Sequence, residues 1–320
     1  MEQNDNRPLM VSIRCLVFNQ ENFLRNCLDS IVMQKTNFRF EAIVHDDAST
    51  DGSAKIIMEY ANKYPDIIKP ILEKENQFSK HNGSIGRIMD KACIGKYIAY
   101  CEGDDYWTDP YKLQKQVDIM ETHKNVMMVY TAFDTVDEDG SPVYRFEYDY
   151  NMKISKSGFV FPSFIFRNVA MTVSCMFRRE VFTSDIRREC NVGMDYLYFL
   201  SAAALGDVVY LNDKTCNYRK AANSVTNAHG EKVRATVIYI LDYVTELYEN
   251  GKIPMSKVHH FKTRTYIAAK GIDLAIKRFG CDYLKKHCIR RSTILYLPIG
   301  LILNLKLNVC YYISKFKNRI

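Results

Sequence analysis

Residues 95–117 read GKYIAYCEGDDYWTDPYKLQKQV, and they hold the most specific pattern in the chain. The apolar run Tyr97–Cys101 predicts a buried strand, because it is short and continuous. The strand should end at the acidic stretch Glu102–Asp105. Residues 111–122 then show helical spacing, so we expect a helix directly after the acidic loop.

Two earlier strands also end in polar loops. The apolar run 10–17 stops at Phe18-Asn19, and residues 40–45 stop at Asp46-Asp47. Helical spacing at 20–34, 53–64 and 87–93, with a further short strand at 67–72, completes an alternating order. This alternation predicts an α/β fold built from βαβ units with a mostly parallel sheet. Ligands bind beyond the carboxyl ends of such strands, so we expect the three polar loops to converge at one edge.

The rest of the chain has a less regular pattern. The expected elements are strands at 126–133, 169–177, 208–211 and 216–219, a hairpin return at 142–146 and a helix at 195–205. Residues 148–157 are polar and aromatic without a clear period, which predicts a mobile loop. Helical spacing dominates from Glu231 onward. We therefore expect one domain at 8–225 and a helical, basic C-terminal extension at 226–320.

Composition excludes several classes of protein. The chain has 320 residues, 47% of them hydrophobic and 25% charged, which excludes disordered, collagen-like and minimal binding modules. The net charge of +7 is uneven, because residues 252–320 hold 15 Lys and Arg against two Asp. Ten scattered cysteines without a CxxC pair indicate a reducing compartment. Residues 1–8 are polar and lack the apolar core of a secretory leader, so we expect a cytoplasmic protein.

The basic tail contains an apolar segment. Residues 294–303 read ILYLPIGLIL, and Lys306 interrupts the run that follows. Basic residues flank the segment: Lys285, Lys286, Arg290 and Arg291 precede it, and Lys315, Lys317 and Arg319 follow it. We expect a peripheral anchor on the anionic inner face of the cell membrane rather than contact with nucleic acid. Packing on the chain's own domain or in a homodimer is the alternative, and spanning is disfavoured because Lys306 would cost about 3 kcal/mol.

The acidic loops allow a specific chemistry. Adjacent carboxylates such as Asp104 and Asp105 repel unless a cation or hydrogen-bond donors neutralise them. Mg²⁺ or Mn²⁺ binds one or two carboxylates together with diphosphate oxygens, although a solvated acidic turn is the alternative. Asp46 and Asp47 accept hydrogen bonds and suit a nucleotide base or ribose. Asp195 suits a general base, or it caps the helix that it begins.

Three stretches together resemble a known family: VSIRCLVFNQENFLRNCLDSI at 11–31, VHDDASTDGS at 44–53, and residues 95–117. Over residues 10–225 the chain resembles the inverting family 2 glycosyltransferases of the GT-A fold, whose mixed, mostly parallel sheet is flanked by helices. The third stretch resembles a bacterial subgroup that acts on cell-surface polysaccharide. The resemblance implies a hexosyltransferase that uses a nucleotide-sugar donor, UDP-linked by expectation, and a glycan or lipid-linked glycan acceptor.

The resemblance also implies roles for individual residues. Phe18 and Asn19 follow the first strand near the base, Asp47 binds uracil beside Asp46, Asp104 faces the ribose, Asp105 binds the divalent cation, and Asp195 is the catalytic base. Weaker matches near the acceptor or diphosphate are Thr172, Arg178, Arg179 and Arg219. Trp107 either stacks on a sugar or belongs to the core. The chain departs from the family at Ala221, which stands where a His that contacts metal or diphosphate is usual. Either the metal relies on the diphosphate, Asp105 and water, or Arg219 or Lys220 neutralises the phosphate, or His229 substitutes for the missing His.

Two other functions stay open at this point. A sugar nucleotidyltransferase uses a related fold, but its Gly-rich phosphate loop has no counterpart at 17–21. A catalytically inactive GT-A scaffold would be expected to have lost Asp104, Asp105 or Asp195, and all three are present.

Overall fold

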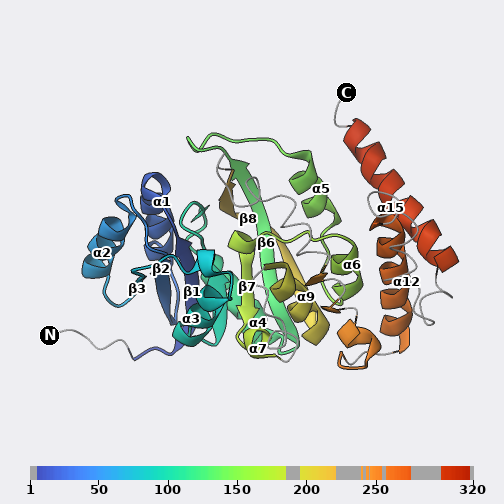
Figure 1. The fold of residues 1–320 in the computed structure, drawn as a ribbon, viewed down its shortest axis with the longest axis horizontal. Helices are drawn as coiled ribbons and strands as arrows, with labels where there is room; N and C mark the ends of the chain where they lie inside the picture. Colours follow the sequence, from blue (N-terminus) through green and yellow to red (C-terminus); the bar gives the residue numbers. More distant parts are fainter. Residues whose placement is uncertain are drawn as a thin grey trace.

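The computed structural model describes residues 6–184, 195–220, 239–240, 243–244, 246–253, 257–274 and 297–317. Its centre is one sheet of eight strands (Figure 1). The strands are β1 (Leu9–Val17), β2 (Arg39–Asp46), β3 (Ile68–Leu72), β4 (Tyr97–Tyr100), β5 (Tyr106–Trp107), β6 (Val126–Val136), β7 (Cys175–Arg178) and β8 (Asp207–Arg219). They lie in the order β3-β2-β1-β4-β7-β6-β8-β5.

The sheet is mostly parallel, as the sequence predicted. Strands β1 to β4 run parallel to one another, and β6 runs parallel to β8. Strand β7 is antiparallel to both β4 and β6, and the short β5 is antiparallel to β8. The reversed strand β7 therefore joins two parallel groups, and its carboxyl end lies at the edge where β4 begins.

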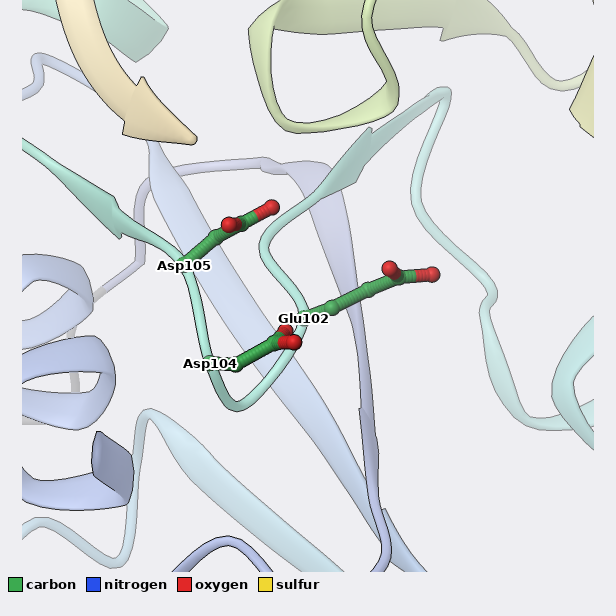
Figure 2. Close-up of side chains that lie close together, drawn as sticks. All are labelled: Glu102, Asp104 and Asp105. Carbon is green, nitrogen blue, oxygen red and sulfur yellow. The ribbon is translucent and has the colours of Figure 1, made fainter. Parts of the chain in front are cut away.

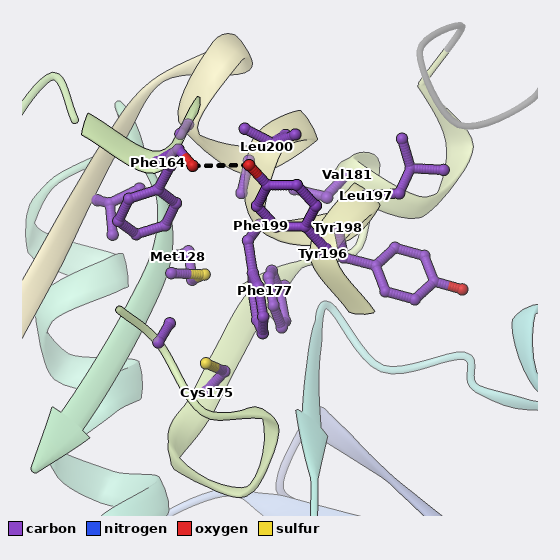
Figure 3. Close-up of a cluster of buried hydrophobic side chains, with 14 of the residues drawn as sticks. Met128, Phe164, Cys175, Phe177, Val181, Tyr196, Leu197, Tyr198, Phe199 and Leu200 are labelled. Atoms are coloured by element: carbon purple, nitrogen blue, oxygen red, sulfur yellow. Dashed lines mark hydrogen bonds between the residues drawn. The ribbon is translucent and has the colours of Figure 1, made fainter. Parts of the chain in front are cut away.

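Helices cover both faces of the sheet and bury two cores. The first core includes side chains of α1 (Glu21–Val32), α2 (Ser53–Lys63) and α4 (Lys112–Thr122). The second includes side chains of α3 (Ser84–Ala92), α6 (Phe161–Phe166), α7 (Glu180–Thr183) and α9 (Asp195–Leu205). Alternation along β2 sends Ala42 and Val44 to the first core and Ile43 to the second. Figure 3 shows part of the second core, where the Tyr196 hydroxyl donates to the carbonyl of Phe164.

The predicted loop at 148–157 is wrong, because most of it is helical. Helix α5 spans Phe146–Ile154. Its Tyr148 ring contacts Phe133 and Tyr218 on the sheet, while Phe146 and Tyr150 contact Tyr311 near the C-terminus. Aromatic side chains on different sides of α5 therefore contact different neighbours. The sequence of this helix thus lacks the single apolar stripe by which a helix is recognised.

Four other predicted elements differ from the structure. The strand expected at 169–177 is a 3₁₀ turn, η2 (Thr172–Ser174), followed by the short β7. The two strands expected at 208–211 and 216–219 are one long strand, β8, whose register with β6 shifts between them. The hairpin return at 142–146 is reduced to a single bridge between Val136 and Pro142. The irregular register of β8 explains why its apolar pattern breaks in the middle.

The described part of the C-terminal extension is helical. Helix α12 (Lys257–Leu274) packs on α6 and on α15 (Leu297–Lys317), which lies at the opposite end of the molecule from α2 (Figure 1). The Asn304 side chain donates to the carbonyl of Ala269 at 3.0 Å. Within the described ranges, no helix is long and apolar enough to cross a membrane. The predicted boundary between residues 225 and 226 falls outside the described residues.

Gly95 gives a stability test of the sheet. A Cβ atom at this position would lie 2.5 Å from the backbone nitrogen of Ser12 on β1. We expect Gly95→Ala to lower the free energy of unfolding by about 1–3 kcal/mol, measured by urea denaturation, because strand backbone has to move. Ile94→Ala, at the exposed preceding residue, is the matched control and should stay within about 0.5 kcal/mol of the unsubstituted chain. Equal stability of the two variants would contradict the prediction.

Candidate active site

The polar loops after β1, β2 and β4 meet at one edge of the sheet. The backbone nitrogen of Asp47 donates to the carbonyl of Val17 at 2.9 Å, and that of Gly103 donates to the carbonyl of Leu16 at 3.1 Å. These bonds extend the parallel pairing just past the ends of the strands. The expected convergence of the three loops is therefore present in the structure.

The loop between β4 and β5 gathers three carboxylates. Oxygen atoms of Glu102, Asp104 and Asp105 all lie within 4.8 Å of one another (Figure 2). Burial raises the pKa of Glu102 and of Asp105 well above their usual values, and the neighbouring carboxylates raise both further. Burial also raises the pKa of Asp104. Three acids at this spacing, Asp105 buried and the other two half-buried, need a counter-charge, and their oxygen atoms are the ligands that Mg²⁺ and Mn²⁺ prefer.

Arg219 holds this acidic loop from the end of β8. Its backbone nitrogen donates to Oδ1 of Asp105 at 2.8 Å, and its Nε donates to the carbonyl of Asp104 at 2.9 Å. Its Nη1 donates to the carbonyls of Asp137 and Glu138 at 2.9 and 2.8 Å. The residue is only 2% exposed, so its guanidinium is committed to backbone oxygens. The Arg219 side chain therefore binds backbone carbonyls rather than the diphosphate that was expected as its partner. Ala221 and His229 lie outside the described residues.

The loops after β1 and β2 are fixed by their own polar side chains. Asn19 adopts a left-handed backbone conformation, and its Oδ1 accepts a hydrogen bond from the Thr50 nitrogen at 2.8 Å. Both oxygens of Asp47 accept backbone N–H groups, from Gln77 at 2.6 Å and Phe78 at 3.0 Å. The sequence did not predict these two bonds, through which Asp47 fixes the backbone of Gln77 and Phe78 next to the loop after β2.

Asp46 and Phe18, in the same two loops as Asp47 and Asn19, each have a group that can contact a ligand. Oδ2 of Asp46 accepts the Ser49 nitrogen at 3.1 Å, whereas Oδ1 is buried and has no partner among the described residues. Phe18, the first residue after β1, is 49% exposed. A buried acceptor beside an exposed aromatic ring can bind a planar base that carries an N–H group.

Asp195 and Thr172 form a second part of the site. Asp195 begins α9, and its Oδ2 accepts a hydrogen bond from Oγ1 of Thr172 at 2.9 Å. Burial raises the pKa of Asp195, and the hydrogen bond from Thr172 and the charge of Arg14 oppose that rise. Asp195 also adds to the raised pKa of Glu102, so the two carboxylates interact electrostatically. The structure thus places a hydrogen-bonded carboxylate near the acidic loop.

Trp107 belongs to the core, which decides between its two predicted roles. It is 1% exposed, and its Nε1 donates to the carbonyl of Val173, next to Thr172, at 3.1 Å. The buried ammonium of Lys112 lies 4.7 Å from the Trp107 ring centroid and donates to Gln116. Nε2 of Gln116 donates in turn to the carbonyl of Ser174. Sequence reasoning missed this network, although Lys112 and Gln116 belong to the stretch quoted first.

Arg178 and Arg179 lie at the opposite edge of the sheet. Because β7 is antiparallel to β4, Arg178 pairs with Tyr97 at the start of β4, whereas the acidic loop follows the end of β4. The Arg178 side chain donates to the carbonyls of Val126, Met120 and His123. Arg179 is exposed and donates to the carbonyl of Ile94. The structure therefore places neither arginine beside the acidic loop, contrary to the expectation from the resemblance.

Comparison with known proteins gives a consistent result. A family model described as Glycosyl transferase family 2 matches residues 12–184. An uncharacterized protein of Mycobacterium tuberculosis is 33% identical over 251 residues, which is 73% of this chain and 68% of that protein. TuaG of Bacillus subtilis, named for teichuronic acid biosynthesis and as a glycosyltransferase, is 23% identical over 233 residues, 72% of this chain and 86% of TuaG.

A solved structure supports the fold. TarS of S. aureus, crystallised with UDP-GlcNAc, matches 92% of this chain and 80% of that chain with a TM-score of 0.60 and 14% sequence identity. The similarity establishes a common GT-A architecture, and so confirms the fold predicted from the three stretches of sequence.

The structural role of Arg178 can be tested directly. We expect Arg178→Met to lower the free energy of unfolding by about 3 kcal/mol, because three carbonyls, those of Val126 and Met120 in buried hydrogen bonds, lose a charged donor. Binding of UDP with Mn²⁺, measured by calorimetry, should stay within a factor of three for the folded variant, which is about 0.6 kcal/mol. Arg179→Met is the matched control and should change neither quantity. Weaker nucleotide binding at unchanged stability would instead return Arg178 to the diphosphate site.

Proposed function

Because the chain belongs to glycosyl transferase family 2, we propose that it transfers a sugar from a UDP-sugar, with inversion, to a hydroxyl group of a glycan or lipid-linked glycan. It is a glycosyltransferase of the GT-A fold, related to enzymes of cell-wall polysaccharide synthesis. The observation that supports the proposal is the acidic loop after β4, whose three carboxylates lie within 4.8 Å of one another, together with the hydrogen-bonded carboxylate of Asp195. The carboxylates of the acidic loop suit a cation that binds a donor diphosphate, and Asp195 suits an acceptor hydroxyl.

The donor half of the site is proposed to bind nucleotide and cation. Asp105, with Glu102 and Asp104 beside it, would hold Mn²⁺ or Mg²⁺ through carboxylate oxygens. When bound, the cation neutralises charge on the departing diphosphate. Phe18 offers a face for the base, and the buried Oδ1 of Asp46 offers an acceptor for its N–H group. The UDP-GlcNAc bound by TarS, which has the same fold, supports a UDP-linked donor.

Asp195 is proposed to be the general base. Inversion requires the acceptor hydroxyl to lose its proton while it attacks the anomeric carbon from the face opposite the diphosphate. Asp195 can take that proton only when ionised, and Thr172 holds its carboxylate in one orientation. Burial raises the pKa of Asp195, so the rate should fall as the pH drops through that raised pKa and should be maintained above it. No covalent intermediate is needed, because positioning and charge neutralisation suffice.

Two matched substitutions separate binding from chemistry. Asp105→Asn should abolish Mn²⁺-dependent UDP binding in calorimetry, whereas Asp195→Asn should leave it within about threefold. Asp195→Asn should lower the hydrolysis of UDP-sugars, in which water takes the acceptor's place, by about 100-fold or more. If the unsubstituted chain binds no nucleotide diphosphate, the inactive scaffold replaces the transferase. Incorporation of a sugar 1-phosphate into a UDP-sugar would instead indicate a nucleotidyltransferase.

The C-terminal helix is proposed to bring the enzyme to the cytoplasmic face of the cell membrane. Helix α15 packs on α12 through one side and exposes apolar side chains on the other, including Ile302 at 68% and Leu305 at 54%. Val309 and Ile313 continue the exposed stripe, and Lys306 and Lys317 are exposed on the same helix. Apolar side chains with lysines beside them fit the boundary of an anionic bilayer, where a lipid-linked acceptor would also be found.

Vesicle binding tests the exposed face of α15. The full chain should sediment with vesicles that contain phosphatidylglycerol more than with pure phosphatidylcholine, and salt should weaken the binding. Ile302→Gln with Leu305→Gln should reduce binding by about tenfold, since two apolar side chains that would enter the bilayer are lost. Ile94→Gln removes an equally exposed apolar residue elsewhere and should bind like the unsubstituted chain. Unchanged vesicle binding of the double variant would overturn the membrane proposal in favour of another surface. If the unsubstituted chain is a dimer that the double variant cannot form, this side of α15 contacts a second copy instead.

A further inference from the structure

Arg14 is a buried cation in the middle of β1. It is 4% exposed, and its Nη1 lies 2.6 Å from Oδ1 of Asp90 on α3. A strand centre flanked by Ile13 and Cys15, both fully buried, ordinarily carries an apolar residue. Burying a charge is expensive unless it is paired, and replacement of such a pair by apolar residues is often neutral or stabilising. Stability alone therefore does not explain why an arginine stands here.

The surroundings of Arg14 connect the two halves of the active site. Its guanidinium carbon lies 5.5 Å from the ring centroids of Tyr100 and Phe182 and 5.9 Å from that of Tyr198. Tyr100 ends β4, two residues before Glu102, and Tyr198 follows Asp195 by three residues on α9. Cation–π contacts of this kind are stronger when they are desolvated, as they are here. The guanidinium thus lies between the strand that leads to the acidic loop and the helix that begins with Asp195.

The charge of Arg14 complements that of Arg219. Arg219 opposes the raised pKa of Asp104, after the larger effect of burial. Arg14 opposes the raised pKa of Asp195 and that of Glu102, again after burial. The charge of Arg14 on β1 acts on Asp195, and Asp195 in turn adds to the raised pKa of Tyr100 on β4, of Cys175 on β7 and of Glu102 in the acidic loop.

We infer that Arg14 is a positioning residue for the transfer reaction: its guanidinium, packed against Tyr100 and Tyr198, holds the helix of Asp195 against the strand that leads to the acidic loop. The inference rests on the proposed function, because it assumes that Asp195 takes the acceptor's proton. Arg14 acts through the aromatic rings and through space. It is not a catalytic residue.

Three full-length variants test the inference. Arg14→Met removes the charge at similar side-chain volume, Arg14→Lys keeps the charge, and Asp90→Asn breaks the ion pair without removing Arg14. The rate of UDP release is measured from pH 5 to 9 with Mn²⁺ and whichever of UDP-glucose, UDP-galactose and UDP-GlcNAc the unsubstituted chain hydrolyses fastest. Calorimetry with UDP and Mn²⁺ is run in parallel, and thermal unfolding confirms that each variant is folded. Arg14→Gln replaces Arg14→Met if the latter does not fold.

We expect Arg14→Met to bind UDP within threefold of the unsubstituted chain and to lose about tenfold or more of kcat at pH 7, with the acid limb of its pH profile moved to higher pH. Arg14→Lys should restore the limb, and Asp90→Asn should leave it in place. The inference is overturned if the pH profile of Arg14→Met coincides with that of the unsubstituted chain, or if Asp90→Asn loses as much kcat as Arg14→Met. Either result would leave Arg14 and Asp90 as a structural ion pair only. A failure of the unsubstituted chain to bind UDP overturns the proposed function, and this inference with it.

Discussion

The repulsion among the carboxylates of the acidic loop is the constraint on which the site depends. Glu102, Asp104 and Asp105 lie within 4.8 Å of one another, where burial strengthens every unfavourable interaction between them. Arg219 offsets part of this cost through its side chain and fixes Asp105 through its backbone nitrogen. Because Arg219 ends β8 and also binds the carbonyls of Asp137 and Glu138, it joins the second parallel group of strands to the loop of the first. The shape of the loop therefore depends on strands far away in sequence.

The stretch that opens the sequence argument has two physical roles. Its acidic residues face the site, whereas Trp107, Lys112 and Gln116 are fully buried. The buried residues hold the turn at 172–174 through the carbonyls of Val173 and Ser174, and that turn presents Thr172 to Asp195. The same stretch thus shapes the loop proposed to bind the donor and frames the proposed base. A pattern of this length is specific because two distant parts of the site depend on it.

Much of the nucleotide-binding half could be predicted from sequence, because there each buried strand is a continuous apolar run and each loop follows in order. β1, β2, β4 and the helix at Asp195 are all found close to their expected bounds. One failure comes from the reversed strand β7. Sequence pattern gives no strand direction, so Arg178 was expected at the site although β7 carries it to the opposite edge. Helix α5 was missed because its aromatic residues face both the sheet and α15.

Helix α15 packs partly through small and polar residues and leaves large apolar side chains exposed. Its packed side holds Gly300, Asn304 and Asn308, and a Cβ at Gly300 would lie 2.8 Å from the Ala268 side chain. Small and amide residues on that side let α12 approach closely. Several apolar residues, among them Ile302 and Leu305, lie outside this contact and are exposed. Apolar composition in the sequence therefore could not separate packing from anchoring, because the helix packs on α12 and α5 and still exposes large apolar side chains. Exposed apolar area of this kind costs about 25 cal/mol per Å² in water, so contact with a bilayer surface, as proposed above, would remove an unfavourable exposure.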